Sequence, residues 1–484
     1  MENYAYATLT ETAEAIRARK LSPVELTQAM LERIAAVDST LYAYARVTPE
    51  LAMAQARQAE SEIAAGHYRG PLHGIPIAHK DICDTAGIAT AAGMPLRSLH
   101  VPQEDATVVA RLAAAGAVTL GKLQLTEGAF AKHHPKIVPP RNPWNADYYA
   151  GASSSGSGVA VAAGLCFGAT ASDTGGSIRY PAAANGIVGL KPTWGRVSRA
   201  GVFPLAPSLD HIGVLARSAA DTGLLLSAMA GLDPKDPTSV AAPIPDFAED
   251  LELDLKSIKI GVDPDYNERG LDADVVRALR TARQAFEDLG AEVCEVRVPD
   301  SEAAAAAWAD IAGVEAALVH ADTYPSRLAE YGPAAGGTIA GLIEHGRSVS
   351  AASLAQAHQA RLAFSGALAT LLTQVNLLLV PTQPRADFTL AEEDALFADA
   401  EALADFIRFA TPYDLSGSPA LVVPASQSFT AKGLPTSFQL IGRHLDEALL
   451  IQTGHAYQSA TGLPWAHPTS ATPDSAPNAE RVEA

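Results

Sequence analysis

One stretch, residues 147–199, constrains the fold of this chain more than any other. It reads DYYAGASSSGSGVAVAAGLCFGATASDTGGSIRYPAAANGIVGLKPTWGRVSR, with two clusters of serine and glycine on either side of an apolar run of small residues. Flexible Gly/Ser linkers do not contain runs such as VAVAAGLCFGA. We therefore predict that residues 159–169 form a tightly packed, buried helix and that the flanking clusters are ordered.

Helix and strand signals alternate through the first part of the chain. Ser22, Pro23 and Glu25 predict a helix start with a capping box, because the serine stands at the N-cap and the glutamate three residues later. Residues 72–81 are typical of a short buried strand that carries Lys80 near its end.

The same alternation continues further along. We predict a helix at 107–115 closed by Gly116 and a strand at 117–120 closed by Gly121, the spacing of βαβ units. The remaining predicted elements are strands at 255–262, 292–298, 375–380 and 419–426, helices at 275–289 and over most of 302–372, and a strand followed by a helix at 433–450. A connection rich in Pro and Asp at 232–245 is expected at the surface. The fold class is therefore α/β.

Charge and composition exclude several functions. The chain has 484 residues and a formal net charge of −19, which opposes binding to nucleic acid or to anionic membranes. The N-terminus has no signal-peptide pattern and no apolar run approaches the ~20 residues that span a bilayer, so we expect a cytoplasmic protein without a membrane partner. Cys83, Cys166 and Cys294 are odd in number and widely spaced, which indicates buried thiols in a reducing compartment.

Neither a metal nor an organic cofactor is indicated. The chain lacks HExxH and paired CxxC motifs, and its glycine-rich segments carry neither GK[ST] nor a GxGxxG that opens a helix. We therefore expect no metal site and no cofactor.

The SDTGGSIR segment suggests acyl-transfer chemistry at Ser177. Two glycines before a serine allow a sharp turn and leave backbone N–H groups unshielded, so we expect an oxyanion hole among the amides of Thr174, Gly175, Gly176 and Ser177. A serine needs a base, and the stretch 147–199 contains no histidine. A lysine is the other established base.

These motifs resemble the amidase signature family, whose hallmark is a Gly/Ser-rich loop, a GGS nucleophile motif and an upstream lysine. The resemblance implies that Ser177 of SDTGGSIR is the nucleophile, Ser153 of GASSSGSG a bridging serine in a cis peptide, and Lys80 of GIPIAHKD the base. Departures from the family pattern are small residues, Ala152 and Ser155, at positions where the family often has glycine.

The resemblance extends over roughly residues 5–466 and implies a single large α/β/α domain, with a mixed central sheet wrapped by helices. We expect this domain to consist of N-terminal helices (1–66), a catalytic core (67–231), a variable substrate-pocket region (232–410) and a C-terminal strand and helix (411–466), and to be followed by a flexible tail (467–484). Ser154, Asp173 and Arg179 are expected to support the site rather than react.

The implied function is hydrolysis of C–N bonds in a small-molecule amide: an acyl amide, an anilide, or a carbamate or urea-like compound. Two alternatives stay open: the glutamine-hydrolysing subunit of a tRNA-dependent amidotransferase, and a non-catalytic relative. The pocket is expected to involve residues 132–140 and 302–400, with Lys132, His133 and His134 either facing solvent or lining the substrate entrance. The sequence leaves the oligomeric state open, with a homodimer as one option.

Overall fold

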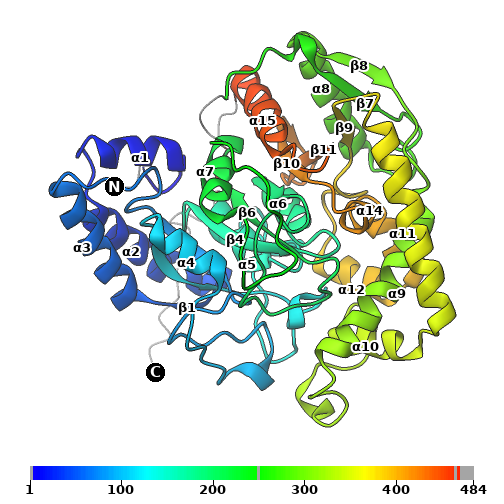
Figure 1. The fold of residues 1–484 in the computed structure, drawn as a ribbon, viewed down its shortest axis with the longest axis horizontal. Helices are drawn as coiled ribbons and strands as arrows, with labels where there is room; N and C mark the ends of the chain where they lie inside the picture. Colours follow the sequence, from blue (N-terminus) through cyan, green and yellow to red (C-terminus); the bar gives the residue numbers. More distant parts are fainter. Residues whose placement is uncertain (1–3, 248–250, 463–465, 469–484) are drawn as a thin grey trace, which may run out of the picture.

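The computed structural model of the protein describes residues 4–247, 251–462 and 466–468. The predicted flexible tail, 467–484, therefore lies almost wholly outside the described residues. Figure 1 shows the N-terminal helices gathered at one side and the helices of the 301–371 region at the other, with the strands between them.

One mixed sheet of eleven strands organises the chain. Its order is β1-β3-β2-β4-β6-β5-β10-β11-β9-β7-β8. The neighbours β3, β2 and β4 are parallel, as are β9, β7 and β8, and the other pairs are antiparallel. The strands are β1 Tyr44–Val47, β2 Pro76–Lys80, β3 Val118–Leu123, β4 Gly168–Asp173, β5 Val188–Lys191, β6 His211–Ala216, β7 Lys259–Val262, β8 Glu292–Glu295, β9 Leu377–Val380, β10 Ala420–Phe429 and β11 Pro435–Gly442.

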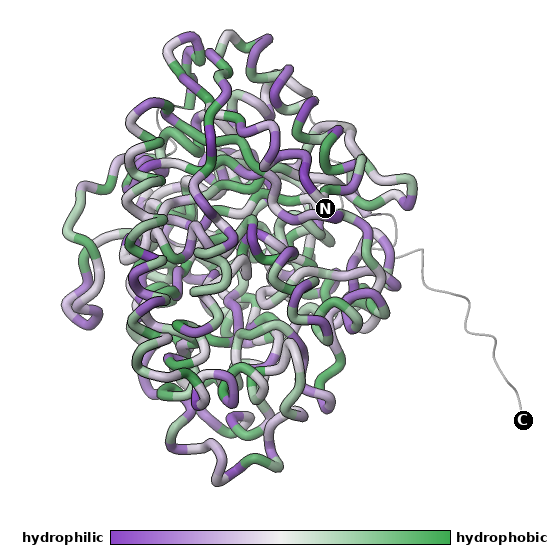
Figure 2. The backbone as a smooth tube through the Cα atoms, turned by 90° about the vertical axis from the view of Figure 1, so that its right-hand side faces the viewer, coloured by the Kyte–Doolittle hydropathy of each residue, from purple (hydrophilic) through white to green (hydrophobic). Residues whose placement is uncertain are grey.

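Helices flank this sheet, which confirms the predicted α/β class and mixed central sheet. They are α1 Leu9–Arg17, α2 Pro23–Leu41, α3 Pro49–Ala64, α4 Thr107–Ala114, α5 Ser155–Ala162, α6 Arg179–Asn185, α7 Ala219–Met229, α8 Ala273–Asp288, α9 Ser301–Val319, α10 Ile339–Ser348, α11 Ala351–Leu371, α12 Leu390–Ala398, α13 Ala400–Ile407, α14 Thr411–Leu415 and α15 Glu447–Thr461. Figure 2 shows hydrophilic and hydrophobic residues interspersed along the backbone. No helix of the described residues is long and apolar enough to span a bilayer.

The predicted helix at 159–169 is only partly correct. Helix α5 ends at Ala162, Gly164 turns the chain with a φ of +67°, and Gly168 already begins β4. All of these residues are buried. A run buried on every side has no polar face, so its periodicity cannot distinguish a helix from a strand.

Gly121 does not end its strand, contrary to the prediction. Strand β3 continues to Leu123, and a Cβ at Gly121 would lie 2.2 Å from the carbonyl oxygen of Arg46. The glycine therefore permits the close approach of β1 rather than a turn.

Two further predictions need correction. Ser22 is the N-cap of α2 and accepts hydrogen bonds from the N–H groups of Val24 and Glu25, both at 3.1 Å, but its hydroxyl donates to Glu60. Among the described residues no bond from Glu25 back to Ser22 completes the capping box. Cys83 and Cys166 are buried free thiols, whereas Cys294 is only half-buried because β8 is the last strand of the sheet.

Candidate active site

Lys80 occupies the end of β2 and is completely buried. Its backbone N–H donates to Thr170 Oγ1 of the neighbouring strand β4 at 3.0 Å, which fixes the end of the strand. Its Nζ lies 2.7 Å from Ser153 Oγ, 2.8 Å from Ser154 Oγ and 2.8 Å from Ser172 Oγ. The structure thus brings the predicted lysine and the two predicted serines of the first cluster together, and adds Ser172, which sequence reasoning missed.

Burial is the main influence on the Lys80 amine. It lowers the pKa of Lys80 from 10.5 to about 7, although Cys83, Asp173 and Asp210 act in the opposite direction. Close to neutral pH, a substantial fraction of Lys80 is therefore uncharged and has a lone pair with which to accept a proton.

Ser153 and Ser154 lie at the start of α5, where the Gly/Ser-rich loop enters the helix. The peptide bond between Ala152 and Ser153 is cis, as the family resemblance implied. Both serines are fully buried, and the N–H of Ser154 contacts the carbonyl oxygen of Ser177 at 3.4 Å. The two serine-containing loops are therefore linked through their backbones, while Lys80 links the first loop to Ser172 near the end of β4.

Ser177 lies on the loop between β4 and α6, is half-buried and borders a cavity. The loop is held by Asp173, whose carboxylate accepts hydrogen bonds from the N–H groups of Gly176 at 2.5 Å and Ile178 at 3.1 Å. Of the four predicted oxyanion donors, Gly176 is therefore already engaged. Among the described residues, none accepts a hydrogen bond from the N–H of Gly175 or of Ser177.

Arg179 and Asp173 form a fully buried ion pair beneath this loop. Arg179 Nε and Nη2 contact the two Asp173 oxygens at 3.0 and 2.9 Å, and Nη2 also contacts Asp414 Oδ2 at 2.6 Å. Burial acts to raise the pKa of Asp173, but the charge and hydrogen bonds of Arg179 outweigh it and hold that pKa well below its usual range. Burial instead raises the pKa of Asp414. Sequence reasoning identified the pair but missed Asp414, which lies 235 residues away from Arg179.

The cavity beside Ser177 is small and apolar, with a volume of about 50 Å³. Its wall is lined by Ala129, Phe130, Ala131, Tyr149, Ala152, Thr174, Gly175, Tyr180, Leu205, Trp308, Phe397, Leu403, Phe406 and Ile407. None of these side chains is charged. Of the region 302–400 that we expect to form the substrate pocket, Trp308 and Phe397 border this cavity. The other aromatic residues come from separate segments, and no local pattern links them.

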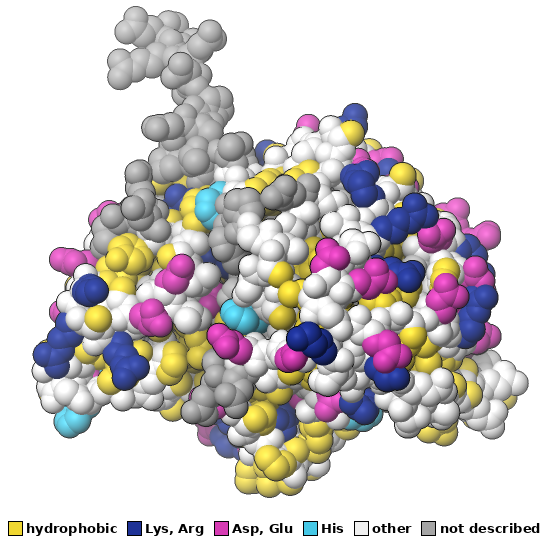
Figure 3. All heavy atoms as spheres, turned by 90° about the horizontal axis from the view of Figure 1, so that it is seen from above, with side chains coloured by type: hydrophobic (Ala, Val, Ile, Leu, Met, Phe, Trp, Pro, Cys, Tyr) yellow, Lys and Arg dark blue, Asp and Glu magenta, His cyan; other side chains and the backbone are white. Residues whose placement is uncertain are grey.

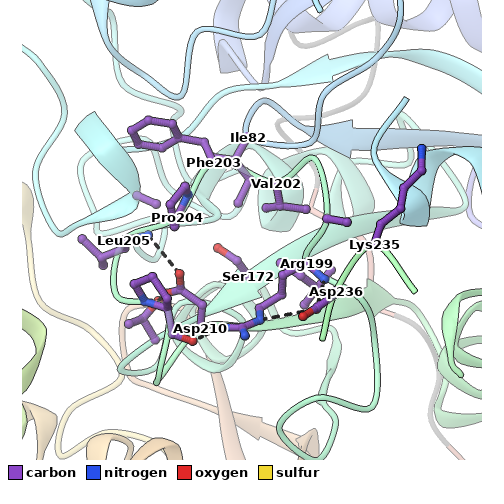
Figure 4. Close-up of a pocket in the computed structure, with 15 residues that line it drawn as sticks. Ile82, Ser172, Arg199, Val202, Phe203, Pro204, Leu205, Asp210, Lys235 and Asp236 are labelled. Carbon is purple, nitrogen blue, oxygen red and sulfur yellow. Dashed lines mark hydrogen bonds and ion pairs between the residues drawn. The ribbon is translucent and has the colours of Figure 1, made fainter. Parts of the chain in front are cut away.

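A second cavity, of about 240 Å³, adjoins the first and shares Ala129, Thr174 and Leu205 with it. Figure 4 shows Ser172 and Asp210 in this cavity, with Arg199, Lys235 and Asp236 to one side. The Asp210 carboxylate accepts hydrogen bonds from Thr174 Oγ1 at 2.6 Å and from the N–H of Leu205 at 3.0 Å (Figure 4).

Lys132, His133 and His134 line a third cavity, of about 360 Å³, next to the Gly/Ser-rich loop. Lys132 forms an ion pair with Asp394 at 2.9 Å, and His133 Nε2 lies 3.0 Å from Ser155 Oγ. Burial lowers the pKa of His133 to about 4, so the imidazole is neutral at physiological pH. Residues 132–140 thus border a cavity distinct from that of Ser177, although the two share Tyr149 and Ala152.

Two further observations concern possible metal ligands and the charge of the surface. No group of three or more His, Cys, Asp or Glu side chains within the described part of the chain is arranged to hold a metal ion. The face seen in Figure 3 carries basic and acidic side chains interspersed with one another.

Known proteins resemble this chain over nearly its whole length. The family model described as Amidase matches residues 25–451. The chain is 45% identical over 454 residues to a "Putative amidase AmiD" of Mycobacterium tuberculosis, covering 94% of each protein. It is 40% identical over 479 residues to a glutamyl-tRNA(Gln) amidotransferase subunit of Halorhodospira halophila, covering 94% of this chain and 97% of that protein. The solved structure of native peptide amidase from Stenotrophomonas maltophilia superposes with a TM-score of 0.80 at 31% identity, covering 95% of this chain and 98% of that one.

Proposed function

The chain belongs to the amidase family and is a hydrolase of carbon–nitrogen bonds other than peptide bonds, and we propose that it cleaves amides through an acyl-enzyme on Ser177. The observation that carries this proposal is the buried amine of Lys80, 2.7 Å from Ser153 Oγ, with the N–H of the adjacent Ser154 in contact with the carbonyl oxygen of Ser177. A buried lysine with a pKa of about 7 is suited to act as a base near neutral pH.

The proposed proton path runs from Ser177 through Ser153 to Lys80. Ser177 Oγ attacks the amide carbon as its proton passes to Ser153, whose own proton passes to Lys80 Nζ. The tetrahedral intermediate then expels the amine, which takes a proton back along the same path, and an ester remains on Ser177. Water, deprotonated through the same two groups, attacks the ester and releases the carboxylic acid.

We assign the oxyanion hole to the N–H groups of Gly175 and Ser177. The N–H of Thr174 lies next to them in the chain. Donors at the developing O⁻ are effective because they are already oriented, and losing one typically costs ~10²-fold to 10³-fold in turnover. The N–H of Gly176 instead serves the loop, since it donates to the carboxylate of Asp173.

The composition of the cavity supports a substrate whose acyl group is apolar. Six aromatic side chains border it: Phe130, Tyr149, Tyr180, Trp308, Phe397 and Phe406. Such walls favour apolar groups by removing apolar surface from water and by ring–ring contact.

The amidotransferase subunit remains the second candidate because of the 40% identity to that protein. Glutamine carries an ammonium and a carboxylate, which need charged or strongly polar partners when they are buried. No charged side chain borders the cavity of Ser177 in the described residues. The composition of this cavity favours an apolar amide over glutamine, whereas charged side chains border the adjoining cavity, namely Arg199, Asp210, Lys235 and Asp236. We also propose that the enzyme is cytoplasmic and acts without a nucleic-acid partner. A non-catalytic relative is disfavoured because lysine and both serines are present.

The proposal is tested by intact-mass analysis after reaction with a fluorophosphonate, followed by peptide mapping and a panel of anilides and primary amides that includes glutamine. We expect one adduct on Ser177, turnover of aryl and arylalkyl amides, and no turnover in Ser177→Ala, which should keep the unfolding temperature of the wild type. Preference for glutamine would favour the amidotransferase function. Wild-type turnover in Ser177→Ala would refute the mechanism.

A further inference from the structure

The side chain of Trp308 both borders the cavity of Ser177 and donates a hydrogen bond to the loop that carries Ser177. No other side chain of the cavity wall does both in the described structure. Trp308 belongs to α9, more than 130 residues after the SDTGGSIR loop, and it is nearly buried, with 7% of its surface exposed. Its ring borders the cavity of Ser177, where it stacks on Phe130 with centroids 6.4 Å apart. Its indole Nε1 donates a hydrogen bond to the carbonyl oxygen of Thr174 at 2.7 Å.

That hydrogen bond fixes one peptide unit of the loop. In a trans peptide, the C=O of one residue and the N–H of the next point in opposite directions. Because the carbonyl of Thr174 is directed at the indole, the N–H of Gly175 is directed away from it. This N–H has no acceptor among the described residues, so it is available to a bound substrate.

The packing around Gly175 restricts the same peptide unit further. A Cβ at Gly175 would lie 2.8 Å from Cζ2 and 3.0 Å from Cε2 of Trp308, and 3.2 Å from Cγ2 of Thr411. The indole therefore leaves no room for a side chain at this position and packs closely against this part of the loop.

Asp173 holds the other side of Gly175, through the N–H groups of Gly176 and Ile178. The peptide unit that presents the Gly175 N–H is therefore held by an indole from a distant helix, and the next peptide unit along the chain is held by a carboxylate within the motif. A flipped peptide at this point would turn a carbonyl oxygen toward the oxyanion and repel it.

We propose that Trp308 is a positioning residue for the oxyanion hole: its indole N–H orients the Thr174–Gly175 peptide so that the Gly175 N–H is ready for the tetrahedral intermediate. This inference rests on the proposed acyl-enzyme mechanism at Ser177. Because the same indole forms part of the cavity wall, the group that fills the cavity packs against the residue that orients the donor.

The test compares two replacements of Trp308. Trp308→Phe keeps an aromatic ring and removes the donor, and β-(3-benzothienyl)alanine at position 308 keeps the bicyclic shape while sulfur replaces the N–H. We expect each to lower kcat about tenfold with KM within about twofold, less than the loss of a whole donor because the Gly175 N–H remains but is no longer held. An aryl trifluoromethyl ketone, whose adduct with serine carries an oxyanion, should bind more weakly by the same factor. The carboxylic acid product should bind as to the wild type.

Phe406→Leu is the matched control, because Phe406 borders the same cavity. It should raise KM and leave kcat within about twofold, since it alters the wall and leaves the oxyanion donors in place. The pH dependence of kcat/KM should be the same in all these variants as in the wild type, since no titratable group is altered.

The outcomes separate this inference from the function it depends on. Unchanged kcat and unchanged trifluoromethyl ketone affinity in the benzothienyl variant would overturn the role of Trp308, as would a loss confined to KM. If Ser177→Ala, assayed in parallel, retained turnover, the acyl-enzyme mechanism would fail and the positioning role with it. Loss of activity in Trp308→Phe alone, with the benzothienyl variant active as wild type, would assign the effect to ring packing and also overturn the inference.

Discussion

The pKa of Lys80 makes a quantitative prediction for the pH dependence of the reaction. Burial lowers this pKa from 10.5 to about 7, a difference that corresponds to about 5 kcal/mol. At pH 7 about half of Lys80 is then neutral, whereas an exposed lysine would be neutral in about one molecule in 3,000. We therefore expect kcat/KM to rise with pH through a single limb centred near 7 and to level off above it.

The assay is kcat/KM for the best anilide from pH 5 to 10 at constant ionic strength, together with the rate of fluorophosphonate labelling, which needs no leaving amine. Both should show the same limb. Asp173 and Asp210 raise the Lys80 pKa, so Asp210→Asn should move the limb to lower pH. A limb near 10 would show that Lys80 is not desolvated in solution. A limb near 7 that persists in the residual activity of Lys80→Ala would assign it to another group.

The same shift predicts an effect on stability. Between pH 7 and 10.5 the unfolded chain holds a proton on Lys80 that the folded chain lacks, so the contribution of Lys80 makes the free energy of unfolding rise with pH across this window. In Lys80→Met this rise should shrink, and the variant should be relatively more stable at pH 7 than at pH 10 when each is compared with the wild type. Urea unfolding at several pH values measures the difference. Parallel stability curves for the two proteins would contradict the buried, titrating lysine.

Three further predictions concern the serine bridge, the buried ion pair and the cavity. Ser153→Ala should lower kcat at least about tenfold because it removes the hydroxyl that we propose relays the proton from Ser177 to Lys80, and undiminished turnover would remove Ser153 from the proposed proton path. Arg179→Met should destabilise the protein by about 3–5 kcal/mol, because Asp173 is then buried without its partner; urea unfolding checks this, and a loss below about 1 kcal/mol would contradict it. Phe406→Ala should shift the preference toward amides with larger acyl groups, seen as a higher ratio of kcat/KM for naphthoyl over benzoyl amides, and an unchanged ratio would place the acyl group elsewhere.

The proposed site was predictable from the sequence because its residues lie in short contiguous motifs. Lys80, Ser153 and Ser177 each stand in a local pattern whose residue types the chemistry requires, and the structure brings the lysine amine to the serine of the first cluster. The mixed sheet was predictable in class but not in detail. Residues 159–169 show why: a fully buried run carries no periodic signal, so the end of α5 and the start of β4 could not be separated.

The precise shape of the loop that bears Ser177 was not predictable from the sequence, because residues far away in the chain hold it in place. Asp414 reaches Arg179 from α14, and Trp308 reaches Thr174 from α9, in a helix whose alanine-rich sequence gives no sign that one indole N–H is needed inside the protein. A buried indole N–H needs an acceptor, so Trp308 could be expected to find one, but only the fold determines that the acceptor is the carbonyl of Thr174. The proposed reactive groups thus lie in short sequence motifs, while the orientation of the proposed oxyanion donor depends on a residue of a distant helix. A comparison of this chain with its relatives that is restricted to the SDTGGSIR motif would therefore miss a substitution at Trp308, which we expect to alter turnover.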